Sequence, residues 1–149
     1  MDLQDDLRAH LRTASLIAVS IIVSLLLYLG IVEFIRARLR PFRGFLAVAD
    51  LELLRYAVFA MAVLSVILVR VLRPRWLRRA AGEDAKTSLH RVEKVSLLTL
   101  FLAEVPGLLG LVLFLVAGLN VDFYILVTVS LFLVFMYFPR RSAWEEGLS

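Results

Sequence analysis

The stretch Thr13–Val32, TASLIAVSIIVSLLLYLGIV, decides the fold, because its twenty residues carry no charged side chain. A helix rises about 1.5 Å per residue and therefore needs about 20 mainly apolar residues to cross the hydrocarbon core of a bilayer, which is about 30 Å thick. The stretch predicts a transmembrane helix over residues 13–35. A cleaved signal peptide fits less well, since its apolar region has about 7–15 residues and its leading segment is basic. Here, Asp2, Asp5 and Asp6 come first.

Three further apolar segments follow the first one. They cover residues 51–72, residues 96–118, in which Glu104 is the single charged residue, and residues 122–138. Each is apolar on all sides, whereas a helix at the surface of a soluble protein has a polar face. The sequence therefore predicts an all-α integral membrane protein with four transmembrane helices in one membrane domain, residues 1–149.

The connection between the last two segments is very short. The connection is Leu-Asn-Val-Asp, residues 119–122, whose last residue also opens the fourth segment, and helices joined by so few residues pack as antiparallel neighbours. We therefore expect the third and fourth transmembrane helices to form a tight antiparallel hairpin. The first two helices have a longer connection, which leaves their packing open.

The composition supports this class and excludes several kinds of function. Of the 149 residues, 61% are hydrophobic and 20% are charged, against about 45–50% and about 25% in soluble domains. The mean hydropathy is +0.87.

The absence of cysteine excludes disulfides, thiolate metal sites and cysteine nucleophiles. The net charge is +4, but the basic residues are divided among several membrane edges and form no nucleic-acid-reading motif, so no nucleic-acid partner is expected.

Three segments are expected to contact water. Residues 1–12 place leucine at every fourth position among charged residues, which predicts a short amphipathic helix at the membrane surface. Residues 73–95 are expected to form a basic cytoplasmic loop and helix, and residues 139–149 a cytoplasmic tail. The cluster that opens the basic segment predicts contact with anionic lipid, with a specific phosphate or nucleotide site as the alternative. Its members are Arg73, Arg75, Trp76, Arg78 and Arg79.

The distribution of basic residues predicts the orientation. Lysine and arginine are concentrated in residues 73–95 and absent from residues 119–122, and these residue types are enriched in cytoplasmic loops. Both termini are then cytoplasmic, and the compact chain suggests a bacterial inner membrane. The first loop opposes this interpretation, because the same topology places four arginines outside the cell. They are Arg36, Arg38, Arg40 and Arg43.

Glu104 is the main candidate for a functional residue. An ionisable group deep inside a transmembrane helix costs about 2.5–3.5 kcal/mol on insertion scales and therefore indicates a functional site. Pro106 follows two residues later and removes the hydrogen bond from a backbone carbonyl one turn earlier, so we expect a polar site inside the membrane. Ser20, Ser24 and Arg70 lie at depths from which they could reach it.

Other residues are given structural roles. Small side chains beside Glu104 predict a face on which another helix packs closely. These are Ala103, Gly107 and Gly110. Arg55 and Glu33 lie at the opposite membrane edge, where they could pair with each other. His10 and His90 fall in surface segments and are expected to be solvated, so no metal site and no cofactor is predicted.

The sequence favours a non-enzymatic role. No catalytic motif is present, and the serines and threonines of the spans have no histidine or lysine at a depth from which it could activate them. The leading hypothesis is an accessory, assembly or self-associating subunit that contacts lipid and either copies of itself or other membrane subunits. The first alternative is an oligomer that conducts protons or cations through Glu104. An enzyme that binds lipid or quinone through the arginine cluster is the third hypothesis.

Overall fold

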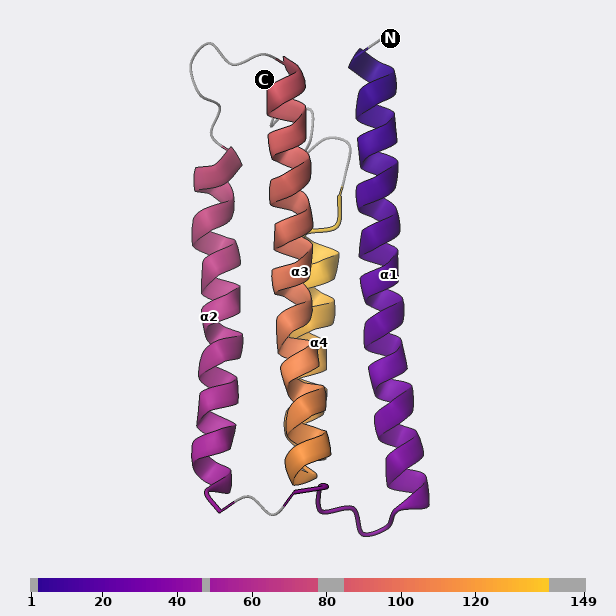
Figure 1. Ribbon diagram of the computed structural model, residues 1–149, viewed down its shortest axis with the longest axis vertical. Coiled ribbons are helices and arrows are strands. Elements are labelled where there is room, and N and C mark those ends of the chain that lie inside the picture. Colours follow the sequence, from indigo (N-terminus) through magenta and orange to yellow (C-terminus); the bar gives the residue numbers. More distant parts are fainter. Residues whose placement is uncertain (1–2, 47–48, 78–84, 140–149) are drawn as a thin grey trace.

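The computed structural model describes residues 3–46, 49–77 and 85–139, and within these ranges the chain is entirely helical apart from its connections. The helices are α1 (Leu3–Arg38), α2 (Leu51–Leu77), α3 (Ala85–Ala117) and α4 (Asn120–Met136). Figure 1 shows that α1 and α2 flank α3 on opposite sides and that α4 lies behind α3. The predicted all-α class is confirmed.

The central helix α3 packs against each of the other three helices. The larger core cluster joins α1, α3 and α4 through side chains such as Leu25, Leu100, Phe114 and Phe123. A smaller cluster joins α2 to α3 and α4. Because α1 and α2 lie on either side of α3, each of them packs mainly against that helix.

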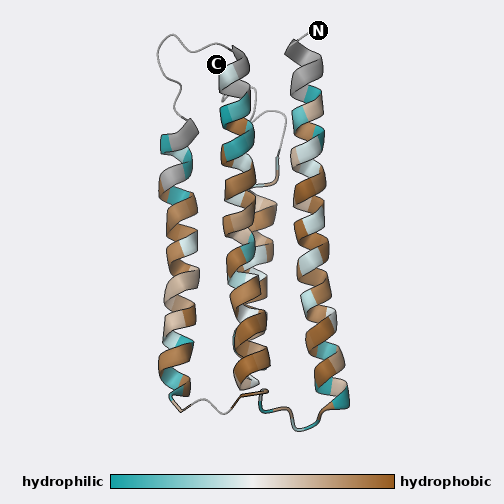
Figure 2. Ribbon diagram, in the orientation of Figure 1, coloured by the Kyte–Doolittle hydropathy of each residue, from teal (hydrophilic) through white to brown (hydrophobic). Residues whose placement is uncertain are grey.

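Three helices, α1, α2 and α3, are long and apolar enough to cross a membrane. The fourth is apolar but has 17 residues, which is somewhat fewer than the roughly 20 that a full crossing takes. Figure 2 shows brown, apolar residues along the middle of the helices and teal, polar residues towards their ends. Large apolar side chains also cover the outside of the bundle. Exposed examples from the four helices are Leu16, Leu27, Leu53, Leu64, Phe101, Val112, Phe132 and Phe135.

Several expected boundaries differ from those of the structure. Residues 3–12 are continuous with α1 instead of forming a separate helix, since neither glycine nor proline interrupts this segment. The basic segment is divided between helices, with residues 73–77 at the end of α2 and residues 85–95 at the start of α3. The predicted tail from residue 140 onward lies outside the described residues.

The loop after α1 closes the end of α3. The backbone N–H groups of Phe45 and Leu46 donate to the carbonyls of Leu115 and Val116 at 2.8 and 3.2 Å, and so satisfy carbonyl groups that a helix end leaves without partners. Two glycines with positive φ, Gly44 at 91° and Gly118 at 71°, let the loop and the α3–α4 connection approach each other. A Cβ on Gly44 would lie 2.2 Å from the Val116 carbonyl oxygen.

Candidate functional site

The carboxyl group of Glu104 is bound by a tyrosine from α1. The Tyr28 hydroxyl donates to Glu104 Oε1 at 2.9 Å, and Ser24, one turn earlier on α1, forms a side-chain hydrogen bond with the same tyrosine. Glu104 and Tyr28 are both half-buried. Ser24 therefore belongs to the site as predicted, but it acts through Tyr28: the three side chains form a hydrogen-bonded series, Ser24–Tyr28–Glu104, between α1 and α3.

A serine from α4 completes the site on the backbone side. Pro106 lacks an N–H and disturbs the helical hydrogen bonds around it. Next to it, the Gly107 N–H donates to Ser130 Oγ at 2.6 Å, and the Ser130 hydroxyl donates to the Glu104 carbonyl oxygen at 3.4 Å. Ser130 is buried, so α4 contributes a polar group at the point where α3 carries its proline.

Two of the predicted neighbours do not reach this site. Ser20 is exposed and has no hydrogen bond among the described residues. Arg70 is also exposed and lies beside Val69, Arg73 and Tyr137. Over residues 3–46, 49–77 and 85–139, the bonds of Glu104 to other helices are those to Tyr28 of α1 and Ser130 of α4, and no ion pair involves Glu104.

The small residues of α3 are covered by helices of the same chain. A Cβ on Gly107 would lie 2.4 Å from Leu25 of α1 and 3.1 Å from Ser130 Oγ of α4, and one on Gly110 would lie 2.9 Å from Leu126 of α4. Ala103 is fully buried. The predicted close packing thus takes place inside the bundle, and these residues form no outer surface for a further helix.

The predicted pair between Glu33 and Arg55 is wrong. Glu33 instead binds Arg36 at 3.0 Å and accepts a hydrogen bond from Tyr124 of α4. Arg55 binds Asp122 at 2.8 Å. The reason is geometric: α1 and α2 lie on opposite sides of α3, so the polar residues at their ends meet the first turns of α4 instead of each other (Figure 1).

The arginine cluster is described only in part. Arg73 is half-buried, and its guanidinium lies over the Tyr137 ring, 4.7 Å from the ring centroid. Arg75 is exposed. Arg78, Arg79 and the side chain of Trp76 lie outside the described residues. Arg73 therefore joins α2 to the residue after α4, in addition to any contact with lipid.

Sequence reasoning missed Tyr28 and Ser130 as partners of Glu104, and Asp122 as the partner of Arg55. Tyr28 and Ser130 are polar residues in otherwise apolar segments, and Asp122 is an acidic residue at the edge of one; this is the signal that could have found them. Their pairing across helices could not be read from a single chain, because residues 28, 104 and 130 meet only after three helices pack.

We expect Ser130→Ala to lower the free energy of unfolding by about 1–3 kcal/mol, the cost of leaving a buried hydrogen-bond donor without its partner. The change removes the partner of the Gly107 N–H and leaves the apolar contacts of α4 in place. Thermal unfolding in detergent measures the effect. Ser20→Ala is the matched control, because this exposed serine of α1 has no hydrogen bond to any residue that the structure describes. Equal stability of the two variants would contradict the role of Ser130.

No protein-family model matches this chain, and comparisons with curated proteins and with solved structures also give no match. The function is therefore argued from the residues of the bundle itself.

Proposed function

We propose that the protein is an integral membrane protein in which all four helices cross the bilayer and α3 and α4 form a tight antiparallel hairpin. The apolar outer faces of the bundle support this placement, since apolar side chains on this scale suit lipid and not water. The concentration of lysine and arginine in residues 73–95 favours cytoplasmic termini, against the four arginines of the first loop, and the compact chain favours a bacterial inner membrane.

Within the membrane, we assign the protein a non-enzymatic role as an accessory or self-associating subunit. The observation that carries this proposal is an apolar groove of about 180 Å³ between α2 and α4. Membrane helices bind one another through close apolar packing, and such a groove accepts side chains of a neighbouring helix. It is lined by Phe59, Ala62, Val63, Val66, Ile67, Ile125, Leu126 and Val129.

Glu104 has a structural role in this proposal. Its side chain joins α3 to α1 through Tyr28, and its backbone carbonyl joins α3 to α4 through Ser130. Polar groups paired inside a membrane bundle hold helices in register. The surface of α3 at Gly107 and Gly110 is covered by α1 and α4. We therefore expect another subunit to bind at the groove between α2 and α4.

The test is native mass spectrometry of the protein purified in mild detergent. We expect species heavier than one 16.9 kDa chain, either a homo-oligomer or a complex with another membrane subunit. Val63→Trp fills the groove and is expected to abolish that association. Leu27→Trp is the matched control, because it enlarges an exposed apolar residue of α1 away from the groove. A monomeric wild-type protein, or equal loss in both variants, would contradict the proposal.

A second candidate function is proton or cation conduction by an oligomer. The observation in its favour is the Ser24–Tyr28–Glu104 chain, since hydroxyl and carboxyl groups in series can pass a proton. Conduction predicts proton flux into proteoliposomes that Glu104→Gln abolishes. Glu52→Gln, which changes an exposed carboxyl in the first turn of α2, should leave the flux unchanged. Equal flux in the wild type and Glu104→Gln would exclude this function.

A further inference from the structure

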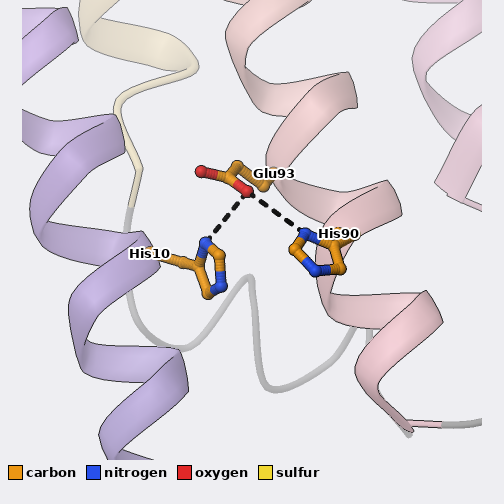
Figure 3. Close-up of side chains that lie close together, drawn as sticks. All are labelled: His10, His90 and Glu93. Carbon is orange, nitrogen blue, oxygen red and sulfur yellow. Dashed lines mark ion pairs between the residues drawn. The ribbon is translucent and has the colours of Figure 1, made fainter.

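The two histidines of the chain converge on one carboxyl group. His10 comes from α1, whereas His90 and Glu93 are one turn apart on α3 (Figure 3). Nδ1 of His10 lies 2.9 Å from Glu93 Oε2, and Nδ1 of His90 lies 3.7 Å from the same oxygen. The two rings pack edge to face with centroids 5.2 Å apart. The expectation that both histidines are merely solvated therefore misses their meeting across two helices.

We propose that His10, His90 and Glu93 bind a divalent transition-metal ion, with Zn²⁺ as the representative. Two imidazole nitrogens and one carboxylate oxygen are a ligand set that zinc takes in proteins. One candidate ligand atom from each residue lies within 4.8 Å of the other two. Neighbouring ligands of a tetrahedral zinc ion are about 3.3 Å apart, given bonds of about 2.0–2.1 Å. The two nitrogen–oxygen distances, 2.9 and 3.7 Å, lie on either side of that value. The ligand nitrogens of the two histidines lie within 4.8 Å of each other, and on binding they would settle at about the same separation of 3.3 Å.

The burial of the three side chains fits a site that is anchored on one side and open on the other. The exposed fractions are 18% for Glu93 and 25% for His10, but 65% for His90. Glu93 and His10 are thus held at the interface of α1 and α3, while the exposed side of His90 leaves access for the ion. Water can supply the fourth ligand. The metal takes the lone pair of each imidazole, and any proton on the ligating nitrogen passes to solvent.

The ion would act as a clamp between two helices. His10 lies near the start of α1, and His90 lies near the start of α3, so the metal would tie the polar ends of these helices together. Buried apolar residues follow the cluster along both helices, with Ala14 on α1 and Val92 and Val95 on α3. This site is separate from the Glu104 site and from the α2–α4 groove, and the proposal stands independently of the proposed function.

The experiment measures Zn²⁺ affinity by competition with a chelating fluorophore, using the full-length protein in detergent. His10→Gln, His90→Gln and Glu93→Gln are each expected to weaken binding at least tenfold, because each removes one ligand of three. Glu52→Gln is the matched control, since it removes an exposed carboxyl of α2 and leaves the cluster intact. Zn²⁺ should also raise the unfolding temperature of the wild type and the control, and not that of the three ligand variants.

Rescue separates loss of a ligand from loss of the fold. His10→Cys replaces one zinc ligand by another, and the chain has no other cysteine. This variant should keep its Zn²⁺ affinity and lose it when the thiol is alkylated. Wild-type affinity no higher than that of the ligand variants would overturn the proposal, because zinc would then bind elsewhere on the surface. Failure of His10→Cys to retain zinc while it remains folded would also count against a site that includes residue 10.

Discussion

Gly44→Ala is expected to lower the free energy of unfolding by at least about 2 kcal/mol. Left-handed backbone costs an L-residue about 1–2 kcal/mol, and the φ of Gly44 is 91°. In addition, the new methyl carbon would lie 2.2 Å from the Val116 carbonyl oxygen. That oxygen belongs to the backbone and accepts the hydrogen bond from Leu46, so it cannot move aside without breaking the closure of α3. Gly118→Ala should behave alike, since its methyl carbon would lie 2.7 Å from the backbone of Arg43.

Gly30→Ala is the matched control for this experiment. Gly30 lies inside α1, and a Cβ there would meet nothing within 4 Å. Alanine is favoured over glycine inside a helix by about 0.5–1 kcal/mol, so this variant should be at least as stable as the wild type. Thermal or denaturant unfolding of the three variants in one detergent gives the comparison. A Gly44→Ala protein as stable as Gly30→Ala would show that the loop does not dock against the end of α3.

Arg55→Met is expected to destabilise the protein by about 1–3 kcal/mol, because it leaves the Asp122 carboxylate buried without its partner. The two sides of this ion pair differ in exposure: the side chain of Asp122 is 3% exposed and that of Arg55 is 52% exposed. The position of Asp122 in the first turn of α4 offsets part of the loss, since a helix N-terminus favours negative charge.

The same asymmetry predicts the outcome of the reverse change. Asp122→Asn leaves Arg55 unpaired but able to reach water, so its effect should be smaller than that of Arg55→Met. The double variant should recover stability relative to Arg55→Met alone, because it removes the unpaired buried charge. Unfolding measurements on the two single variants and the double variant test this. Equal destabilisation by the two single changes would contradict the assignment of Asp122 as the buried partner.

The helical segments could be predicted from the sequence because length and hydropathy determine them locally. Uncharged runs such as residues 13–32 leave few alternatives to a long apolar helix. The ends of the helices were less predictable, since charged residues such as those at positions 3–12 are compatible with continuing a helix as well as ending it. The helix α4 has the 17 residues of the predicted segment 122–138, but it begins at Asn120 and ends at Met136, so both of its ends lie two residues earlier than predicted.

Only some residues of the candidate site could be predicted from the sequence. Glu104 and Pro106 stand out in an apolar segment, and Ser24 follows from its depth on the first helix. The side chains that bind them depend on how helices rotate about their axes and which helices become neighbours. Tyr28 and Ser130 face α3, whereas Ser20, one turn from Ser24, is exposed. The contact of His10 with His90 and Glu93 could not be predicted for the same reason, because His10 lies about 80 residues before the other two in the sequence.

The central position of α3 has a consequence for how the protein is made. Synthesis proceeds from the N-terminus, so α1 and α2 are complete before the helix that lies between them exists. In the proposed membrane setting, lipid rather than protein would cover the inner faces of these two helices, including Ala18 and Ala62, which are buried in the finished bundle. We therefore expect the order of assembly to differ from the order of synthesis. The first two helices would stay apart in the bilayer until α3 is inserted, and both would then pack against it.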